Sequence, residues 1–122
     1  MLEIHKLTDL KSINKIKNKY NLCCDSVIVG VFENNLLTEF ASYYFESDNM
    51  TIEFISHNKD LTILDGLIKT LIFYADLAKK RYIKLSKDFE VLAKYFNFQM
   101  IDEYYVLDIY SQYKNKCSCG EK

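Results

Sequence analysis

Apolar and polar side chains alternate at the start of the chain and then change to a helical spacing. Residues 2–7, LEIHKL, alternate in the way that is typical of a half-buried strand. Thr8 and Asp9 offer an N-cap, and apolar residues then recur at helical spacing up to Tyr20, with lysines opposite. The pattern therefore predicts a strand followed by an amphipathic helix that ends near Asn21.

Three strands are predicted to follow as a meander. Residues 27–33 are rich in β-branched side chains, residues 36–46 return as a second strand, and residues 50–56 form the third. Asn34-Asn35 is a candidate for a two-residue turn, because asparagine tolerates the left-handed conformation that a tight hairpin demands. Gly30, inside the first of these strands, indicates either a bulge or a close backbone approach.

A long amphipathic helix is predicted next. The apolar residues from Ile63 to Ala78 form a wide face, which indicates a helix that lies against a sheet. Thr62 is predicted to cap this helix, with Asp65 at the capping-box spacing three residues later. Residues 79–81, KKR, follow at its C-terminal end, where the helix dipole favours cations.

The remaining pattern predicts shorter elements. Residues 82–85 are expected to form a strand, and Ser86 is expected to cap a short helix that runs through Tyr95. Asn97 is placed to close that helix in a left-handed conformation. Residues 98–109 are extended and apolar, with a bend at Asp102-Glu103 that would divide them into two strands.

The predicted order of elements is β-α-β-β-β-α-β-α-β(β). A three-stranded meander joined to a β-α-β crossover indicates an α/β (α+β) fold, with a mixed, mainly antiparallel sheet and helices on both faces. We expect one domain over residues 1–110 and a polar, cysteine-containing tail over residues 111–122.

The composition narrows the class of protein. The chain has 122 residues, of which 49% are hydrophobic, and a formal net charge of −1. The near-neutral charge, with Arg81 as the only arginine, disfavours nucleic acid and anionic membranes as partners. No apolar run approaches the ~20 residues of a membrane span, and the N-terminus lacks the apolar core of a signal peptide. We therefore expect a cytoplasmic protein with reduced cysteines.

The ordered set of segments, from residues 3–9 to residues 106–109, resembles the GNAT superfamily of acyl-CoA-dependent N-acetyltransferases. The segment LAKYFNF, residues 92–98, is similar to the F-Y-x-x-x-G-F ending of that family. The short form is also similar to the acetyltransferase-like domain at the front of citrate lyase ligases. The resemblance implies transfer of an acetyl group from acetyl-CoA to a small-molecule or peptide amine.

The resemblance also implies where acetyl-CoA would bind. In the family the pantetheine arm pairs with the exposed edge of the fourth strand, which corresponds to residues 51–56 here. The pyrophosphate rests on backbone N–H groups at the start of the following helix, which corresponds to residues 59–64 with Lys59 at the basic position. The implied cofactor-binding residues are Phe54, Ile55, Ser56, Lys59, Leu61, Thr62, Ile63 and Leu64.

Glu53 is the candidate catalytic residue. It lies in the fourth strand, where some members of the family hold a carboxylate that deprotonates the amine, and a carboxylate inside a sheet suits general-base work. The alternative is that Glu53 faces solvent from an antiparallel strand.

Functional positions also depart from the family pattern. Thr62 and Leu64 stand where the family has glycines, Ala93 aligns with its tyrosine general acid, and Asn97 replaces a glycine. These departures define an alternative function, a GNAT-like binding or regulatory domain without catalysis.

The four cysteines define a third and weaker alternative, a thiol-based metal or redox protein. Cys23, Cys24, Cys117 and Cys119 offer four thiolates, which suit tetrahedral zinc if the tail folds back. Neither pair has Cys-x-x-Cys spacing, so free thiols and no metal site are predicted. The apolar final strand, residues 104–109, is predicted to be an edge at which two copies pair as a homodimer.

Overall fold

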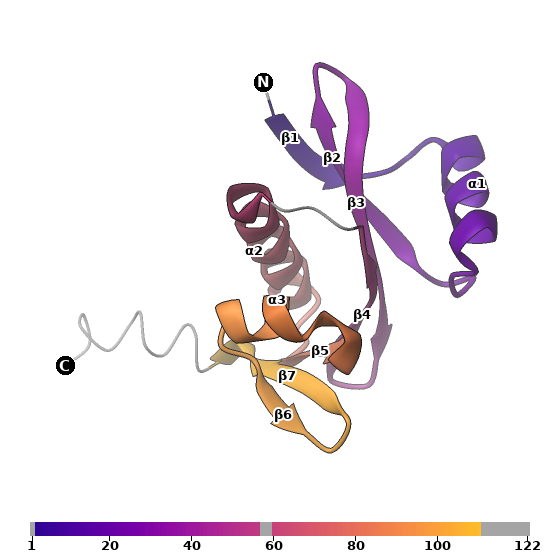
Figure 1. The fold of residues 1–122 in the computed structure, drawn as a ribbon. Helices are drawn as coiled ribbons and strands as arrows, with labels where there is room; N and C mark the ends of the chain where they lie inside the picture. The colour runs from indigo at the N-terminus through magenta and orange to yellow at the C-terminus, as the bar shows by residue number, and fades with distance from the viewer. Residues whose placement is uncertain (1, 57–59, 111–122) are drawn as a thin grey trace. The chain divides into compact units, whose positions relative to one another are not determined.

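The computed structural model describes residues 2–56 and 60–110 (Figure 1). Its elements are β1 (Leu2–Lys6), α1 (Leu10–Tyr20), β2 (Val27–Glu33), β3 (Leu36–Glu46), β4 (Asn49–Ile55), α2 (Leu61–Leu77), β5 (Tyr82–Ser86), the 3-10 helix η1 (Lys87–Phe89), α3 (Glu90–Tyr95), β6 (Gln99–Ile101) and β7 (Tyr104–Asp108). The predicted order is confirmed, and the last extended segment divides into β6 and β7 as expected. None of the described helices is long and apolar enough to cross a membrane.

The strands form a seven-stranded sheet in the order β1-β2-β3-β4-β5-β7-β6. The pairs β1–β2, β2–β3, β5–β7 and β6–β7 are antiparallel. The predicted α/β class with a mainly antiparallel sheet is therefore confirmed. The choice of residues 104–109 as a free edge is wrong, because β7 is paired on both sides and β6 is the outer strand. The pairing of two copies as a homodimer stays a prediction, but β7 does not offer an edge for it.

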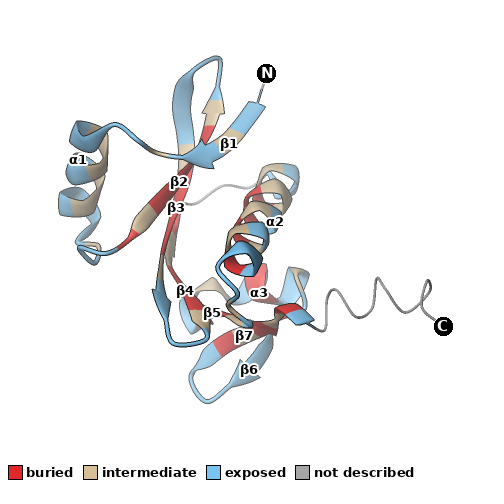
Figure 2. Cartoon of the chain, turned by 180° about the vertical axis from the view of Figure 1, so that it is seen from behind, coloured by how far each residue is buried: buried red, intermediate tan, exposed pale blue. Residues whose placement is uncertain are grey.

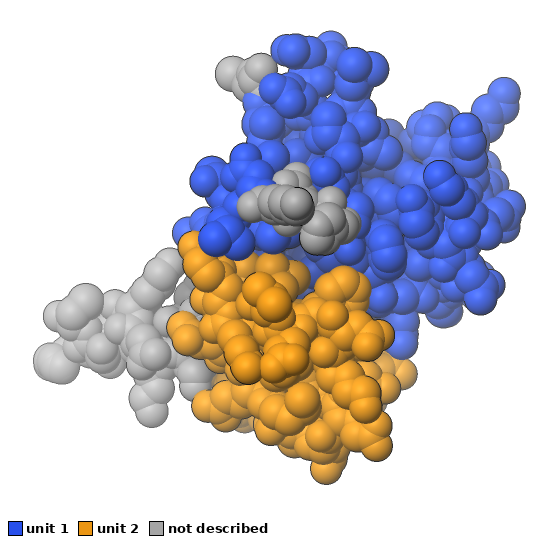
Figure 3. Space-filling view, viewed as in Figure 1, with its two compact units in different colours: residues 1–44, 52–71 blue, residues 45–51, 72–122 orange. Residues whose placement is uncertain are grey.

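The chain divides into two compact units (Figure 3). Unit 1 comprises Met1–Tyr44 and Ile52–Leu71, and unit 2 comprises Phe45–Thr51 and Ile72–Lys122, so the boundary passes through β3, β4 and α2. Each unit has a buried core (Figure 2). In unit 1 the core is Ile28, Val29, Val31, Phe40, Ala41, Tyr43, Ile52, Ile55, Leu64, Leu67, Ile68 and Leu71. In unit 2 it is Met50, Ala75, Ile83, Leu85, Leu92, Ala93, Phe98, Tyr105, Leu107 and Ile109.

Three of the predicted turns and caps are confirmed, whereas Asp9 stands at the N-cap of α1 without a side-chain cap hydrogen bond. Asn34 and Asn35 both have positive φ, at 54° and 69°, as a tight hairpin requires. Asn97 ends α3 with a φ of 63°. The Ser86 hydroxyl accepts a hydrogen bond of 3.2 Å from the N–H of Asp88, so it caps the helical segment that follows β5.

The start of α2 differs from the prediction. The helix begins at Leu61, so Thr62 lies inside its first turn and is not the cap. Asp60 takes that role, because its carboxylate accepts a hydrogen bond of 2.9 Å from the N–H of Thr62. Asp65 does not reach back to the helix start, since its carboxylate pairs with Lys69 at 2.9 Å.

Of the two alternatives for Gly30, the structure supports the bulge, and it adds close side-chain neighbours in place of a close backbone approach. The pairing of β2 with β3 shifts register between Val31 and Phe32, next to this glycine. A Cβ atom at position 30 would also lie 2.6 Å from Leu37 Cδ1, 2.8 Å from Leu7 Cδ1 and 2.9 Å from Phe32 Cε1. The position therefore has no room for a larger residue unless these side chains move.

We expect Gly30→Ala to lower the free energy of unfolding by about 1–3 kcal/mol, the usual cost of overpacking a core. Gly66→Ala is the matched control, because a Cβ there would meet only Ile4 Cδ1, at 3.1 Å. Alanine is also favoured over glycine in a helix by ~1 kcal/mol, which offsets that tight contact. Urea denaturation of both variants measures the difference, and equal stabilities would contradict the packing argument.

Candidate active site

Glu53 of β4 is half-buried, and its carboxylate accepts hydrogen bonds from three donors in unit 1. The backbone N–H of Cys23 donates to Oε2 at 2.7 Å, and the Ser42 hydroxyl donates to Oε1 at 3.3 Å. The Ser26 hydroxyl also donates to Oε1. Glu53 is therefore held in one orientation and is not the solvated side chain of the alternative prediction. A carboxylate has about four acceptor positions, so the donors among residues 2–56 and 60–110 leave one position, on Oε2.

The donors around Glu53 come from segments far away in the sequence. Ser26 ends a tight turn between α1 and β2, in which its N–H donates to the carbonyl oxygen of Cys23 at 3.1 Å. Ser26 and Ser42 are both buried, so their hydroxyl groups need partners inside the protein. Glu53 supplies those partners and links the turn, β3 and β4. Sequence inspection missed both serines, because nothing in their local sequence distinguishes them from other serines in strands.

The end of β4 carries the residues predicted to meet the pantetheine arm. The Phe54 ring packs 5.3 Å from the ring of Phe40, and the Ile55 side chain is buried. The Ser56 N–H donates to the Phe40 carbonyl oxygen at 2.8 Å, and its hydroxyl donates to Glu39 at 2.5 Å. The polar groups of Ser56 therefore have partners on β3.

The first backbone N–H groups of α2 were predicted to receive a pyrophosphate. In the structure the N–H groups of Thr62 and Ile63 donate to Asp60 Oδ1, at 2.9 Å and 3.4 Å. The N–H of Leu64 donates to the Asp60 carbonyl oxygen at 3.1 Å, an ordinary bond inside the helix. An internal carboxylate thus occupies the position of the expected anion. Lys59, the predicted basic residue, lies outside the described residues.

Thr62 and Leu64, which stand where the family has glycines, lie in different environments. Thr62 is exposed, whereas Leu64 is buried in the core of unit 1. The Leu64 side chain therefore serves packing, and the exposed start of the helix is formed by Leu61 and Thr62.

Ala93 stands on α3 where the family has its tyrosine acid. Tyr95 lies on the same helix, but it is exposed and stands two residues further on, a rotation of about 200°. Ala93 is fully buried. On the same helix, the Lys94 ammonium lies 2.7 Å from the Glu90 carboxylate. That hydrogen bond lowers the pKa of Glu90 and raises the pKa of Lys94, so both groups remain charged near neutral pH. Neither is suited to deliver a proton to a thiolate.

Cys23 and Cys24 are free and exposed. Their sulfur atoms and a carboxylate oxygen of Asp25 all lie within 4.8 Å of one another. Cys117 and Cys119, the other half of the four-cysteine alternative, lie outside the described residues.

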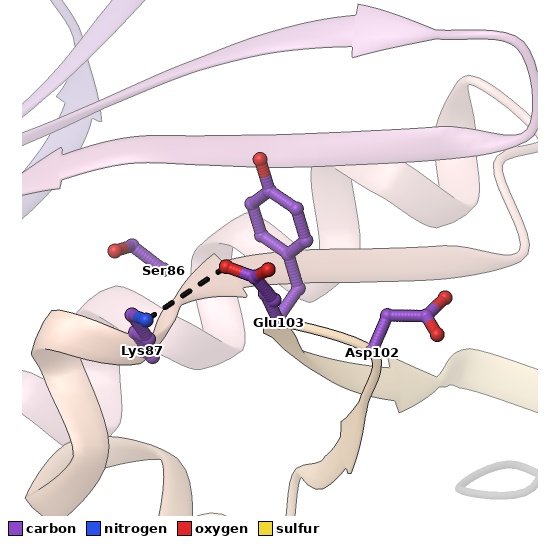
Figure 4. Close-up of a pocket in the computed structure, with 5 residues that line it drawn as sticks. Ser86, Lys87, Asp102 and Glu103 are labelled. Carbon is purple, nitrogen blue, oxygen red and sulfur yellow. Dashed lines mark ion pairs between the residues drawn. The ribbon is translucent and has the colours of Figure 1, made fainter.

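A separate pocket lies in unit 2, with a volume of about 450 Å³ (Figure 4). Its lining residues are Ser86, Lys87, Asp102, Glu103 and Tyr104. Lys87 and Glu103 form an ion pair at 3.8 Å across it. The pocket contains none of the residues predicted above to be catalytic or to bind the cofactor.

Comparison with solved structures identifies the fold. A probable acetyltransferase from Staphylococcus epidermidis superposes with a TM-score of 0.71 at 14% identity, covering 88% of this chain and 99% of that one. An N-acetyltransferase from Staphylococcus aureus gives 0.68 at 16% identity, covering 89% and 98%. A GNAT family acetyltransferase from Elizabethkingia anophelis, with acetyl-CoA bound, gives 0.68 at 12% identity, covering 88% and 97%. The sequence matches no protein-family model and no curated protein.

These similarities show that the chain has the GNAT fold, as the resemblance in the sequence implied. The match extends over almost the whole length of each of these acetyltransferases. The resemblance to citrate lyase ligases stays an expectation. At such low identity the comparisons establish the fold alone, so the roles of Glu53 and of the helix start depend on the chemistry of this chain.

We expect Ser26→Ala to lower the free energy of unfolding by about 1.5–3 kcal/mol, because hydrogen bonds to charged groups contribute in that range. In a double-mutant cycle with Glu53→Gln, the two losses should not add, since both variants disturb the same contact. Ser12→Ala is the control, because Ser12 donates to the Asp9 carboxylate at 2.7 Å in an exposed position. Additive losses in urea denaturation would show that Ser26 and Glu53 do not interact.

Proposed function

We propose that this protein transfers an acetyl group from acetyl-CoA to the amine of a small molecule or peptide. The fold supports acetyl transfer in general, since the similar structures are GNAT acetyltransferases. The observation that carries the proposal is the Glu53 carboxylate, which three donors hold in place and on which the described residues leave one acceptor position of Oε2. An oriented carboxylate on the fourth strand is what deprotonation of an amine needs.

The proposed reaction is a direct transfer. The amine nitrogen attacks the thioester carbonyl carbon, and Glu53 takes a proton from that nitrogen, directly or through one water molecule. Backbone N–H groups of β4 polarise the thioester oxygen, and the carbon–sulfur bond breaks to give an amide and the CoA thiolate. Because Ala93 offers no acid, the thiolate takes its proton from water. Lys59 and the start of α2 are proposed to hold the pyrophosphate.

A second candidate function is a GNAT-like binding or regulatory domain without catalysis. The specific observation in its favour is the Asp60 carboxylate, which already accepts two N–H groups at the start of α2. A negative charge at that point repels a pyrophosphate and competes for its donors. Titration calorimetry with acetyl-CoA tests the transferase, because no heat together with no thermal shift excludes it. Binding without release of CoA thiol in the presence of amines would favour the binding domain.

We expect Glu53→Gln to bind acetyl-CoA as wild type does and to lower kcat by about 10²–10⁴-fold, the usual contribution of a general base. Release of CoA thiol, measured with a panel of amines, reports the rate. Glu46→Gln is the matched control, because the Glu46 carboxylate also accepts a hydrogen bond from a hydroxyl, that of Thr51 at 3.1 Å. The control should keep its activity. Unchanged kcat in Glu53→Gln would exclude Glu53 as the base.

We expect Asp60→Ala to tighten acetyl-CoA binding by about 2–5-fold, since one charge at a helix end contributes about 0.3–1 kcal/mol. The same variant should lower the free energy of unfolding by about 0.5–2 kcal/mol through loss of the cap. Asp65→Ala is the control, because the Asp65 carboxylate pairs with Lys69, whereas the N–H groups of Thr62 and Ile63 donate to Asp60. Calorimetry measures both affinities, and weaker binding by Asp60→Ala would show that Asp60 assists the cofactor.

A further inference from the structure

The turn between α1 and β2 gathers the ligating atoms of three consecutive residues. The Sγ atoms of Cys23 and Cys24 and a carboxylate oxygen of Asp25 all lie within 4.8 Å of one another. Among the described residues, no other three His, Cys, Asp or Glu side chains converge in this way. All three residues are exposed, and the two thiols are free. None of the three side chains has a role in the proposed acyl transfer, although the backbone N–H of Cys23 donates to Glu53.

The spacing of these atoms is close to that of a zinc coordination shell. Zn–S bonds of about 2.3 Å and Zn–O bonds of about 2.1 Å, at tetrahedral angles, place neighbouring ligand atoms roughly 3.6–3.8 Å apart. Cys24 Sγ already lies 3.8 Å from Asp25 Oδ1. The other pairs of ligand atoms lie within 4.8 Å, so the group has to contract by about 1 Å at most to surround one ion.

The backbone that carries the group is held by contacts on both sides. The Cys23 N–H donates to Glu53 at 2.7 Å, and the Ser26 N–H closes the turn on the Cys23 carbonyl oxygen at 3.1 Å. The Lys17 ammonium donates to the Cys24 carbonyl oxygen at 2.7 Å. A loop fixed in this way loses little conformational freedom when it binds an ion.

The charges of the group are also suitable. Two thiolates and one carboxylate carry −3, so a bound divalent cation leaves −1, which the nearby Lys17 ammonium offsets. Sulfur ligands select Zn²⁺ and similar thiophilic ions and reject Mg²⁺ and Ca²⁺, which prefer oxygen.

We propose that Cys23, Cys24 and Asp25 bind one Zn²⁺ ion per chain, with the fourth position taken by water. Where both thiols are protonated before binding, the ion replaces two protons, which are released to solvent. The ligating side-chain atoms take no part in the proposed acyl transfer, so either proposal can fail without the other, even though the Cys23 N–H donates to Glu53.

The test is a titration of the full chain, reduced and freed of metal. Addition of Cd²⁺ as a probe should produce a thiolate-to-metal charge-transfer absorption that saturates at one ion per chain, and Zn²⁺ should displace it. Cys23→Ser and Cys24→Ser should each weaken Zn²⁺ binding by at least about 100-fold, because loss of an outer-shell partner alone costs 10–100-fold. Asp25→Asn, which keeps both thiols, should also weaken it.

The double variant Cys117→Ser/Cys119→Ser is the control, because it removes the thiols of the tail and keeps those of the turn. Its affinity should equal that of wild type. Bound Zn²⁺ should also protect Cys23 and Cys24 of the unmodified chain from alkylation by iodoacetamide, which needs no variant. No absorption with wild type, binding that is lost only in the tail variant, or one ion shared by two chains would each overturn the proposal.

Discussion

The hydrogen bonds to Glu53 are the constraint on which the part of unit 1 around β4 depends. They join β4 to the buried serines of β3 and of the α1–β2 turn. A buried hydroxyl without a partner costs ~1–3 kcal/mol, so removal of this one carboxylate would leave two such groups unpaired. The side chain proposed as a base is therefore also a structural anchor. Stability must be measured beside activity before a loss of turnover is assigned to chemistry.

At the start of α2, a second carboxylate, that of Asp60, accepts hydrogen bonds from backbone N–H groups that were expected to bind a ligand. Asp60 satisfies the N–H groups of Thr62 and Ile63, which in a GNAT acetyltransferase fold would be available to a phosphate. The fold does not need a glycine-rich loop for its stability, because the Asp60 cap and the buried Leu64 side chain stabilise the helix start without one. The fold can therefore be stable in a chain whose helix start does not bind a phosphate. Evidence for the fold is for that reason not evidence for activity.

The sequence predicted those features that depend on neighbouring residues. Asn34-Asn35 and Asn97 adopt the left-handed conformation because their own side chains tolerate it, and the Ser86 cap needs only the two residues that follow. The cap of α2 was misplaced because Asp60 and Thr62 are both good capping residues two positions apart, and sequence alone does not rank them. The partners of Glu53 and the inner place of β7 depend on pairing across the sheet, which a single sequence does not display.

Cys23 connects the two parts of the molecule to which chemistry has been assigned. Its N–H orients the Glu53 carboxylate, and its thiol belongs to the proposed zinc group. An ion that fixes the turn would restrict the motion of the N–H and hydroxyl donors around Glu53. If the turn and the carboxylate are coupled in this way, a change at Glu53 also alters the affinity for the ion. Glu53→Gln, a variant that keeps all three zinc ligands, therefore measures whether the turn and the carboxylate act as one unit.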